Sequence, residues 1–299
     1  MAGRRIRWGT TPNERAPRWL AVIFIGYLVW SLGPLILAVG FSFNAADSVT
    51  RWEGFSLRWW VGDPEAEESI VFDPDTRTAL AHSLVLASAV TLVAVPMGSA
   101  LALGVVRWRR RIGRVIGATT ILALALPPLA LGTELWLLFA FPLRSVPFGA
   151  FGWFGTKAQI AGLVTLFMPY AFAIVAVRVL LLEPNQEECA ADLGASPTQA
   201  LKRVVLPQIG PAVVAAVAIV FSGALSEFVV SRALYGTNDT RTLAMALFGA
   251  MGGPSPRHSA IGTTLAVAGA LSIVVLVLAF RRTGRLTGPR RRPEHLPRR

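Results

Sequence analysis

Six long apolar stretches, separated by short polar segments, dominate the pattern along the chain. They cover approximately residues 19–43, 79–106, 114–140, 158–182, 211–234 and 259–280. Each holds the roughly 20 apolar residues that an α-helix needs to cross a hydrocarbon core about 30 Å thick. Because the backbone must bond to itself in lipid, helices are favoured over isolated strands. The pattern predicts an all-α polytopic membrane protein with six transmembrane helices.

A secretory signal peptide is the alternative interpretation of the first stretch. Its apolar run exceeds the roughly 7–15 residues of a signal peptide's apolar region, and no small-residue cleavage site follows. We therefore expect a spanning helix.

The composition agrees with a membrane protein. Hydrophobic residues make up 54% of the 299 residues and charged residues 15%, whereas soluble domains carry about 25% charged residues. This argues against a soluble enzyme and against a disordered chain. The single cysteine, Cys189, excludes an intrachain disulfide and a cysteine-ligated zinc cluster.

Proline and glycine recur inside the stretches, for example at Pro96, Pro169, Gly98, Gly162 and Gly223. Proline bends a helix because it removes one backbone bond, and small residues let helices approach closely in lipid. These positions predict a closely packed bundle that can flex.

The net charge of +12 follows the membrane topology rather than one polar face. Of the 29 Lys and Arg residues, 21 lie on one side of the predicted spans, which makes that side cytoplasmic. We expect a basic cytoplasmic N-terminus (1–18), a transmembrane domain (19–280) and a basic cytoplasmic tail (281–299). Anionic lipid explains this charge, so no nucleic-acid partner is expected.

Two external segments leave alternatives open. The loop at 44–78 is rich in Asp and Glu, which serves either solubility or an acidic surface for a cationic ligand or basic partner. The segment at 238–256 has an apolar middle between polar ends. It forms either a short re-entrant helix that gates the mouth or a surface cap.

Two carboxylates fall inside the predicted spans, and such groups are functional candidates because an unpaired charge in lipid is costly. Rising about 1.5 Å per residue in a straight helix, Glu134 would lie roughly 30 Å and Glu227 roughly 24 Å from the inner ends. Both would then border an outer vestibule, with Ser226 beside Glu227. The alternative for Glu134 is exposure at the outer interface.

The cytoplasmic loop at 183–210 predicts a helix, a turn and a second helix. The first helix should cover 185–193 and end at Gly194, which suits a left-handed cap. Ser196 is the expected N-cap with Pro197 in the first helical position. The second helix should reach about residue 205 and end at Pro207. Such a short amphipathic projection suits a groove on a soluble partner.

This loop resembles the EAA motif of ABC-importer permease subunits. That motif reads Glu-Ala-Ala, three residues, Gly, nine residues, Ile, one residue, Leu-Pro. The matching positions here are Glu188, Cys189, Ala190, Gly194, Val204, Leu206 and Pro207. The departures are Cys189 for the first Ala and Val204 for Ile. The resemblance implies a type I importer permease bundle whose loop docks on a separate ATPase subunit.

Further segments are similar to the same family, and those at 225–231 and 253–256 most resemble its C-type spermidine/putrescine subunit. That subunit usually carries two adjacent acids where this chain has Ser226 and Glu227. The resemblance implies a polyamine or a related small cationic or polar solute as cargo, with Glu227, Ser226 and Glu134 along its path. Phosphonate, ferric ion and thiamine are the alternative cargoes.

The implied assembly contains a pair of ATPases, a second permease and an extracytoplasmic binding protein in a bacterial or archaeal inner membrane. No phosphate-binding loop of the G-x-x-x-x-G-K-[ST] form is present, so ATP and Mg²⁺ are expected on the ATPase and no cofactor or metal on this chain. No catalytic motif is visible, which argues against an enzyme. A passive channel would not need the loop at 183–210.

Overall fold

The computed structural model describes residues 18–62, 69–107, 111–141, 154–183, 185–249 and 255–284. Regular structure in these ranges is helical, apart from a single antiparallel bridge between Asn44 and Phe55. The predicted all-α class is therefore confirmed. Most of the predicted N-terminal segment (1–18) and tail (281–299), namely residues 1–17 and 285–299, lies outside the described residues, as do residues 63–68 of the external loop.

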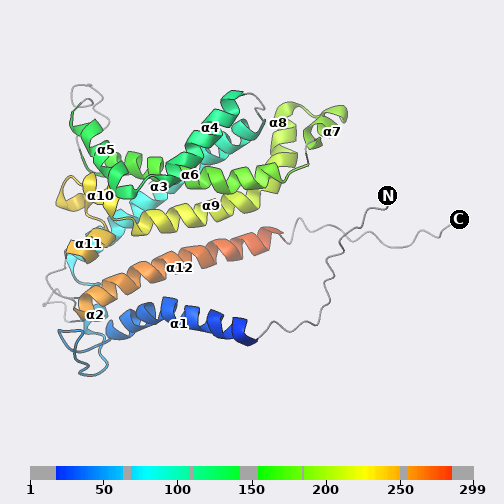
Figure 1. Ribbon diagram of the computed structural model, residues 1–299. Helices are drawn as coiled ribbons and strands as arrows, with labels where there is room; N and C mark the ends of the chain where they lie inside the picture. The colour runs from blue at the N-terminus through cyan, green and yellow to red at the C-terminus, as the bar shows by residue number, and fades with distance from the viewer. Residues whose placement is uncertain are drawn as a thin grey trace.

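The longest helices run roughly along one direction, with short elements at both ends (Figure 1). The helices are α1 (Arg18–Phe41), α2 (Arg58–Val61), α3 (Pro74–Arg107), α4 (Arg111–Leu122), η1 (Ala123–Ala125), α5 (Pro128–Ala140), α6 (Thr156–Leu180), α7 (Gln186–Asp192), α8 (Pro197–Ala200), η3 (Leu201–Val205), α9 (Leu206–Ser226), α10 (Val229–Ala233), η4 (Asn238–Thr240), α11 (Leu243–Gly249) and α12 (Pro256–Gly284). The α7–α8 segment lies at one end, and α2, α10 and α11 lie at the opposite end.

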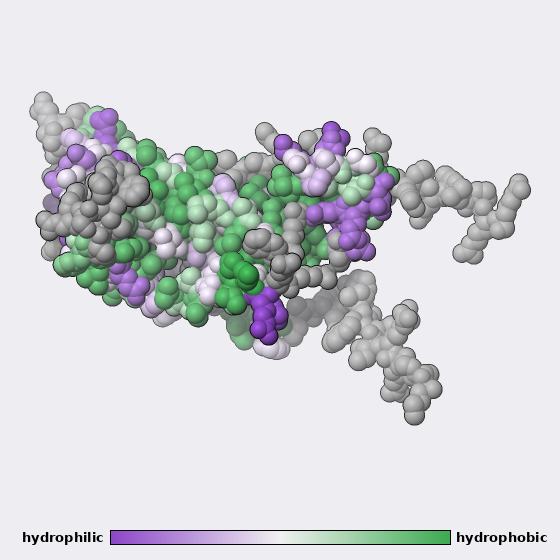
Figure 2. Space-filling view, turned by 90° about the horizontal axis from the view of Figure 1, so that it is seen from above, coloured by the Kyte–Doolittle hydropathy of each residue, from purple (hydrophilic) through white to green (hydrophobic). Residues whose placement is uncertain are grey.

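Four helices of the described chain are long and apolar enough to cross a membrane. They are Trp19–Phe41, Pro74–Val106, Thr156–Leu180 and Pro197–Ser226, and a bent helix pair adds a fifth. The sixth predicted span falls within α12, part of whose side chains lie outside the described residues. Six spans therefore remain a prediction. Figure 2 shows apolar residues over the middle of the molecule and hydrophilic residues gathered near its ends.

The third predicted span is not one straight helix. Its two halves, Arg111–Ala125 and Pro128–Ala140, meet at an angle of 107°. Leu126 and Pro127 both have extended backbone, with ψ of 125° and 133°. Each of them precedes a proline, and the proline ring disfavours helical backbone in the residue before it. The expected depth of Glu134 assumed a straight helix, so that estimate was wrong.

The fifth predicted span starts earlier and ends earlier than expected. One continuous helix covers Pro197–Ser226, so Pro207 does not end it. The turn Leu201–Val205 is a π-helix, in which the N–H of Leu206 donates to the carbonyl oxygen of Leu201. This wider turn directly precedes Pro207, whose ring would otherwise crowd the preceding turn of a regular α-helix. The helix ends instead at Glu227, where the backbone becomes extended.

The core lies where α3, α6 and α9 pack together. Leu86, Phe172 and Val220, one from each helix, are fully or almost fully buried. A Cβ built on Gly98 of α3 would lie 2.8 Å from the Cβ of Ala171 on α6. Small residues thus permit the close packing that the sequence predicts.

α1 lies beside α12 and apart from this core (Figure 1). Its large apolar side chains are mostly exposed, among them Val22, Trp30 and Ile36. An apolar helix with so little protein contact is suited to lipid or to another membrane chain.

The described part of the external loop is folded onto itself. The Asn44 side chain accepts from the N–H of Ala46 and of Glu53 and donates to two carbonyl oxygens. Among the described acids, Asp47 pairs with Arg58 at 3.0 Å and Asp73 pairs with Arg257. These two carboxylates are therefore already engaged within the chain.

Candidate functional site

The turn between α7 and α8 has the predicted geometry. Gly194 has φ of +82°, in the left-handed region that favours glycine. Its N–H donates to the carbonyl oxygen of Ala191 at 2.8 Å, and that of Ala195 donates to Ala190 at 3.0 Å. These bonds satisfy carbonyls at the end of α7. The predicted cap at Gly194 is confirmed.

The start of α8 is also as expected. The Ser196 hydroxyl accepts from the N–H of Gln199 at 3.3 Å, while the Gln199 side chain accepts from the N–H of Ser196 at 3.0 Å. Pro197 occupies the first turn. This reciprocal capping fixes the direction in which the chain leaves the turn.

The α7–α8 segment presents an exposed, partly apolar surface. Leu193 is 89% exposed, the largest exposed fraction among the large apolar residues of the described chain. A groove of about 400 Å³ lies beside it and is lined by Glu183, Asn185, Gln186, Cys189, Ala190, Leu193, Val204 and Gln208.

Three of the residues at positions of the EAA motif line this groove together: Cys189, Ala190 and Val204. Glu188, Gly194, Leu206 and Pro207 are exposed nearby on the same segment and are not part of that lining. The sequence pattern did not identify Leu193 as a site residue. An apolar side chain at the end of a short polar helix could have indicated a contact with a partner.

Gln208 joins this segment to the membrane helices. Its side-chain Nε2 donates to Oε1 of Gln186 on α7 and, at 2.9 Å, to the carbonyl oxygen of Val204. Its own carbonyl oxygen accepts from Nε of Arg178, in the last turn of α6, at 2.9 Å. Nothing in the sequence pattern marked Gln208, because these bonds connect residues 22 and 30 positions apart.

Glu227 occupies the break between α9 and α10. One carboxylate oxygen accepts from the N–H of Val230 at 2.8 Å, and the other accepts from the N–H and the hydroxyl of Ser231 at 2.9 and 3.1 Å. A carboxylate at a helix N-terminus is stabilised by these donors and by the helix dipole. The half-buried Glu227 therefore has a structural contact that the sequence did not indicate.

The two other proposed path residues have different surroundings. The exposed Ser226 hydroxyl donates back to the carbonyl oxygen of Ser222 at 2.9 Å. Glu134 is exposed on α5. That helix packs against α10, where a Cβ on Gly132 would lie 3.2 Å from the Cβ of Ala233. Glu134 and Glu227 thus lie on neighbouring elements.

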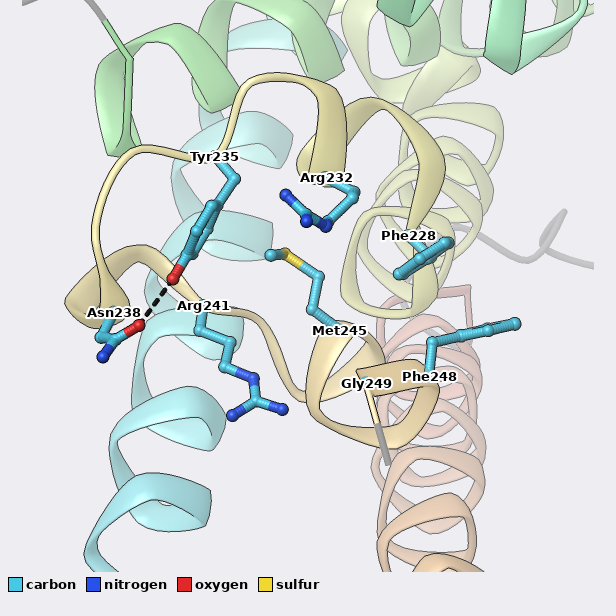
Figure 3. Close-up of a pocket in the computed structure, with 8 residues that line it drawn as sticks. All are labelled: Phe228, Arg232, Tyr235, Asn238, Arg241, Met245, Phe248 and Gly249. Atoms are coloured by element: carbon cyan, nitrogen blue, oxygen red, sulfur yellow. Dashed lines mark hydrogen bonds between the residues drawn. The ribbon is translucent and has the colours of Figure 1, made fainter. Parts of the chain in front are cut away.

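A second cavity, of about 630 Å³, lies between α10 and α11 (Figure 3), elements that Figure 1 places at the end of the molecule away from α7. It is lined by Phe228, Arg232, Tyr235, Asn238, Arg241, Met245, Phe248 and Gly249. The segment at 238–256 supplies the last five of these residues and contains the short helix α11 (Leu243–Gly249), while its residues 250–254 lie outside the described residues. Whether α11 gates a path stays a prediction.

Aromatic contacts shape this cavity. The rings of Phe228 and Phe248 stack with centroids 4.3 Å apart. The Arg232 guanidinium lies over the Tyr235 ring at 5.3 Å, and the Tyr235 hydroxyl donates to Oδ1 of Asn238 at 2.8 Å (Figure 3). The sequence did not identify this cavity, because its lining is assembled from three separate elements.

The described residues contain no group of three or more His, Cys, Asp or Glu side chains placed to hold a metal ion.

Comparison with known proteins agrees with this arrangement. The family model described as "Binding-protein-dependent transport system inner membrane component" matches residues 94–293. The putrescine transport system permease protein PotI of Escherichia coli (strain K12) is 28% identical over 268 residues, covering 88% of this chain and 90% of that protein. The spermidine/putrescine transport system permease protein PotC of Haemophilus influenzae is 27% identical over 261 residues, covering 87% and 93%.

Solved structures share the fold. A chain of a bacterial ABC transporter involved in the import of the acidic polysaccharide alginate superposes with a TM-score of 0.66 at 18% identity, covering 90% of this chain and 96% of that one. A second structure of an alginate transporter, in complex with a periplasmic protein bound to an alginate pentasaccharide, also gives 0.66, at 15% identity and with 91% and 96% coverage.

Proposed function

The chain belongs to the family of binding-protein-dependent transport system inner membrane components, and we propose that it carries polyamines, or a related small cationic or polar solute, as one permease of its importer. As a permease subunit of an ABC importer it is a membrane protein and not an enzyme, since a separate ATPase subunit hydrolyses ATP. The family implies ATPase and binding-protein partners.

The exposed α7–α8 segment is the observation that carries the proposed coupling to the ATPase. It is a small projection with its turn fixed by Gly194 and Ser196, and Leu193 faces solvent beside an apolar groove. An amphipathic helix of this kind is suited to a groove on a soluble partner. We place Glu188, Cys189, Ala190, Gly194, Val204, Leu206 and Pro207 at or beside this contact, on the cytoplasmic side, with both termini there as well.

The proposed mechanism is a shift between two populated states of the bundle. Closure of the ATPase pair on ATP would displace α7, and the bonds of Gln208 would pass that displacement to α6 and α9. The path would form against a second, different permease, with Glu227, Ser226 and Glu134 as acceptors for an ammonium group.

Polyamine cargo is supported by the names of the two permeases compared above, PotI and PotC, at 28% and 27% identity. The test is ATP-dependent uptake of radiolabelled putrescine and spermidine by the purified complex in liposomes. Mass spectrometry of the co-purified subunits would identify the ATPase, the second permease and the binding protein. Uptake that is competed by thiamine, phosphonate or ferric ion, and not by unlabelled polyamine, would overturn the proposed cargo.

A further inference from the structure

Two arginines in the cavity at the α10–α11 end have no carboxylate beside them. None of the eight lining residues is acidic. Among the described residues, no Asp or Glu oxygen lies within the 4.0 Å ion-pair distance of Arg232 or Arg241. Two guanidinium groups in one recess with aromatic walls add positive charge to this part of the surface.

Two acidic residues lie in a neighbouring cavity rather than in this one. Arg241 also borders a smaller cavity of about 300 Å³ that contains Asp73 and Asp75. Asp73 bonds to Arg257 and to the Thr76 hydroxyl, so its charge is already balanced. Since no Asp or Glu lines the larger cavity itself, its two guanidinium groups are open to a partner from outside the described chain.

Both arginines rest against other groups of the cavity wall. Arg232 rests over Tyr235, whose hydroxyl is bonded to Asn238. Arg241 lies so close to Gly249 that a Cβ there would be 2.9 Å from its Nη2. In Figure 3 the Arg232 side chain lies between Tyr235 and Phe228, and the Arg241 side chain extends from its loop toward α11. Such positioning lowers the entropy that is lost when a ligand binds.

We propose that this cavity receives acidic side chains of the extracytoplasmic binding protein. The proposal rests on the proposed function, in which the α7–α8 segment is cytoplasmic and the opposite end of the molecule faces the extracytoplasmic side. Guanidinium groups pair with carboxylates through two parallel hydrogen bonds. A polycationic solute would be repelled by the same two charges, so the cargo itself is a poor occupant. Transport in this family depends on a binding protein, which is a protein partner that can present carboxylates to this cavity.

The experiment uses the complete importer in nanodiscs with the binding protein identified by co-purification. ATPase stimulation is measured against binding-protein concentration for the wild type and for the double variant Arg232→Gln/Arg241→Gln. We expect the half-maximal concentration to rise about tenfold, since two partly exposed ion pairs are lost. The variant Arg232→Lys/Arg241→Lys, which keeps both charges, should retain most of the affinity.

The matched control is Arg77→Gln/Lys157→Gln, which removes two positive charges from exposed positions near the same end of α3 and α6, outside the cavity lining. It should leave the half-maximal concentration within about twofold of wild type, because isolated surface charges contribute little. The wild-type value should also increase as salt is raised from low to physiological concentration.

Three outcomes would overturn the proposal. They are an unchanged half-maximal concentration in the glutamine variant, an equal loss in the control, and a wild-type value insensitive to salt. If binding-protein affinity is unchanged while solute uptake falls, the arginines contact the solute instead. A wild-type complex without any stimulation or uptake would contradict the proposed function itself.

Discussion

The side-chain amide of Gln208, near the start of α9, donates to the side-chain oxygen of Gln186 on α7. The Gln208 carbonyl oxygen accepts from Arg178 on α6. A single residue thus connects the exposed α7–α8 segment with two of the three helices that form the core. Such a bond network can transmit a displacement when its elements have two discrete positions.

Replacing Gln208 by leucine should weaken the coupling between ATP hydrolysis and transport. The leucine cannot bond Gln186 or Val204, and a typical net hydrogen bond contributes about 1 kcal/mol. We expect several-fold fewer solute molecules to be transported per ATP hydrolysed, measured by parallel uptake and phosphate-release assays in proteoliposomes.

The variant Gln208→Asn provides a comparison, because it keeps the amide but is one methylene shorter and should not reach Gln186. It should resemble Gln208→Leu in transport per ATP. A wild-type ratio in both variants would exclude Gln208 from coupling.

Gly194→Ala should loosen the α7–α8 turn through backbone strain alone. A Cβ at this position meets no atom of the described residues within 4 Å, but φ of +82° is costly for any L side chain. The expected cost is about 1–2 kcal/mol. We expect less ATPase subunit to co-purify with the permease, quantified by mass spectrometry.

The control for this substitution is Gly210→Ala. Gly210 lies in α9 with regular helical backbone, and a Cβ there also meets no described atom within 4 Å. Alanine favours a helix over glycine by up to about 1 kcal/mol, so this variant should assemble at least as well as the wild type. Equal assembly of Gly194→Ala would count against the docking role.

Glu227→Gln should reduce uptake of putrescine more than Glu134→Gln does. The neutral amide offers one oxygen where the carboxylate offers two to Val230 and Ser231, and it removes a negative charge. Both variants should reach the membrane in normal amounts, checked by immunoblot. Normal putrescine uptake by Glu227→Gln would show that its charge has no part in the path.

Gly98→Ala should destabilise the contact between α3 and α6. The added Cβ would lie 2.8 Å from Ala171 and from backbone atoms of Met168 and Phe172, so a helix must move. Overpacking of this kind typically costs about 1–3 kcal/mol. We expect a lower melting temperature of the detergent-solubilised protein.

Gly104→Ala is the matched control on the same helix, because its Cβ meets no described atom within 4 Å. It should melt at or slightly above the wild-type temperature. The same melting temperature for both variants would contradict the close packing at Gly98.

Local chemistry determined much of the fold. Runs of about 20 apolar residues set the long helices, because lipid leaves no other partner for backbone groups. Gly194 and Ser196 fixed the α7–α8 turn through bonds to residues at most five positions away. Interactions over so short a range can be read directly from the order of residues.

Tertiary structure decided what depends on distant parts of the chain. Pro207 was expected to end a helix, but a π-turn lets α9 continue past it. The 107° bend moved Glu134 off the line of α4, and the Glu227 carboxylate bonds to the first turn of α10. The arginine cavity and the Gln208 bonds join elements that meet only after the bundle packs. Sequence periodicity describes one helix at a time, whereas these features arise from the positions of helices relative to one another.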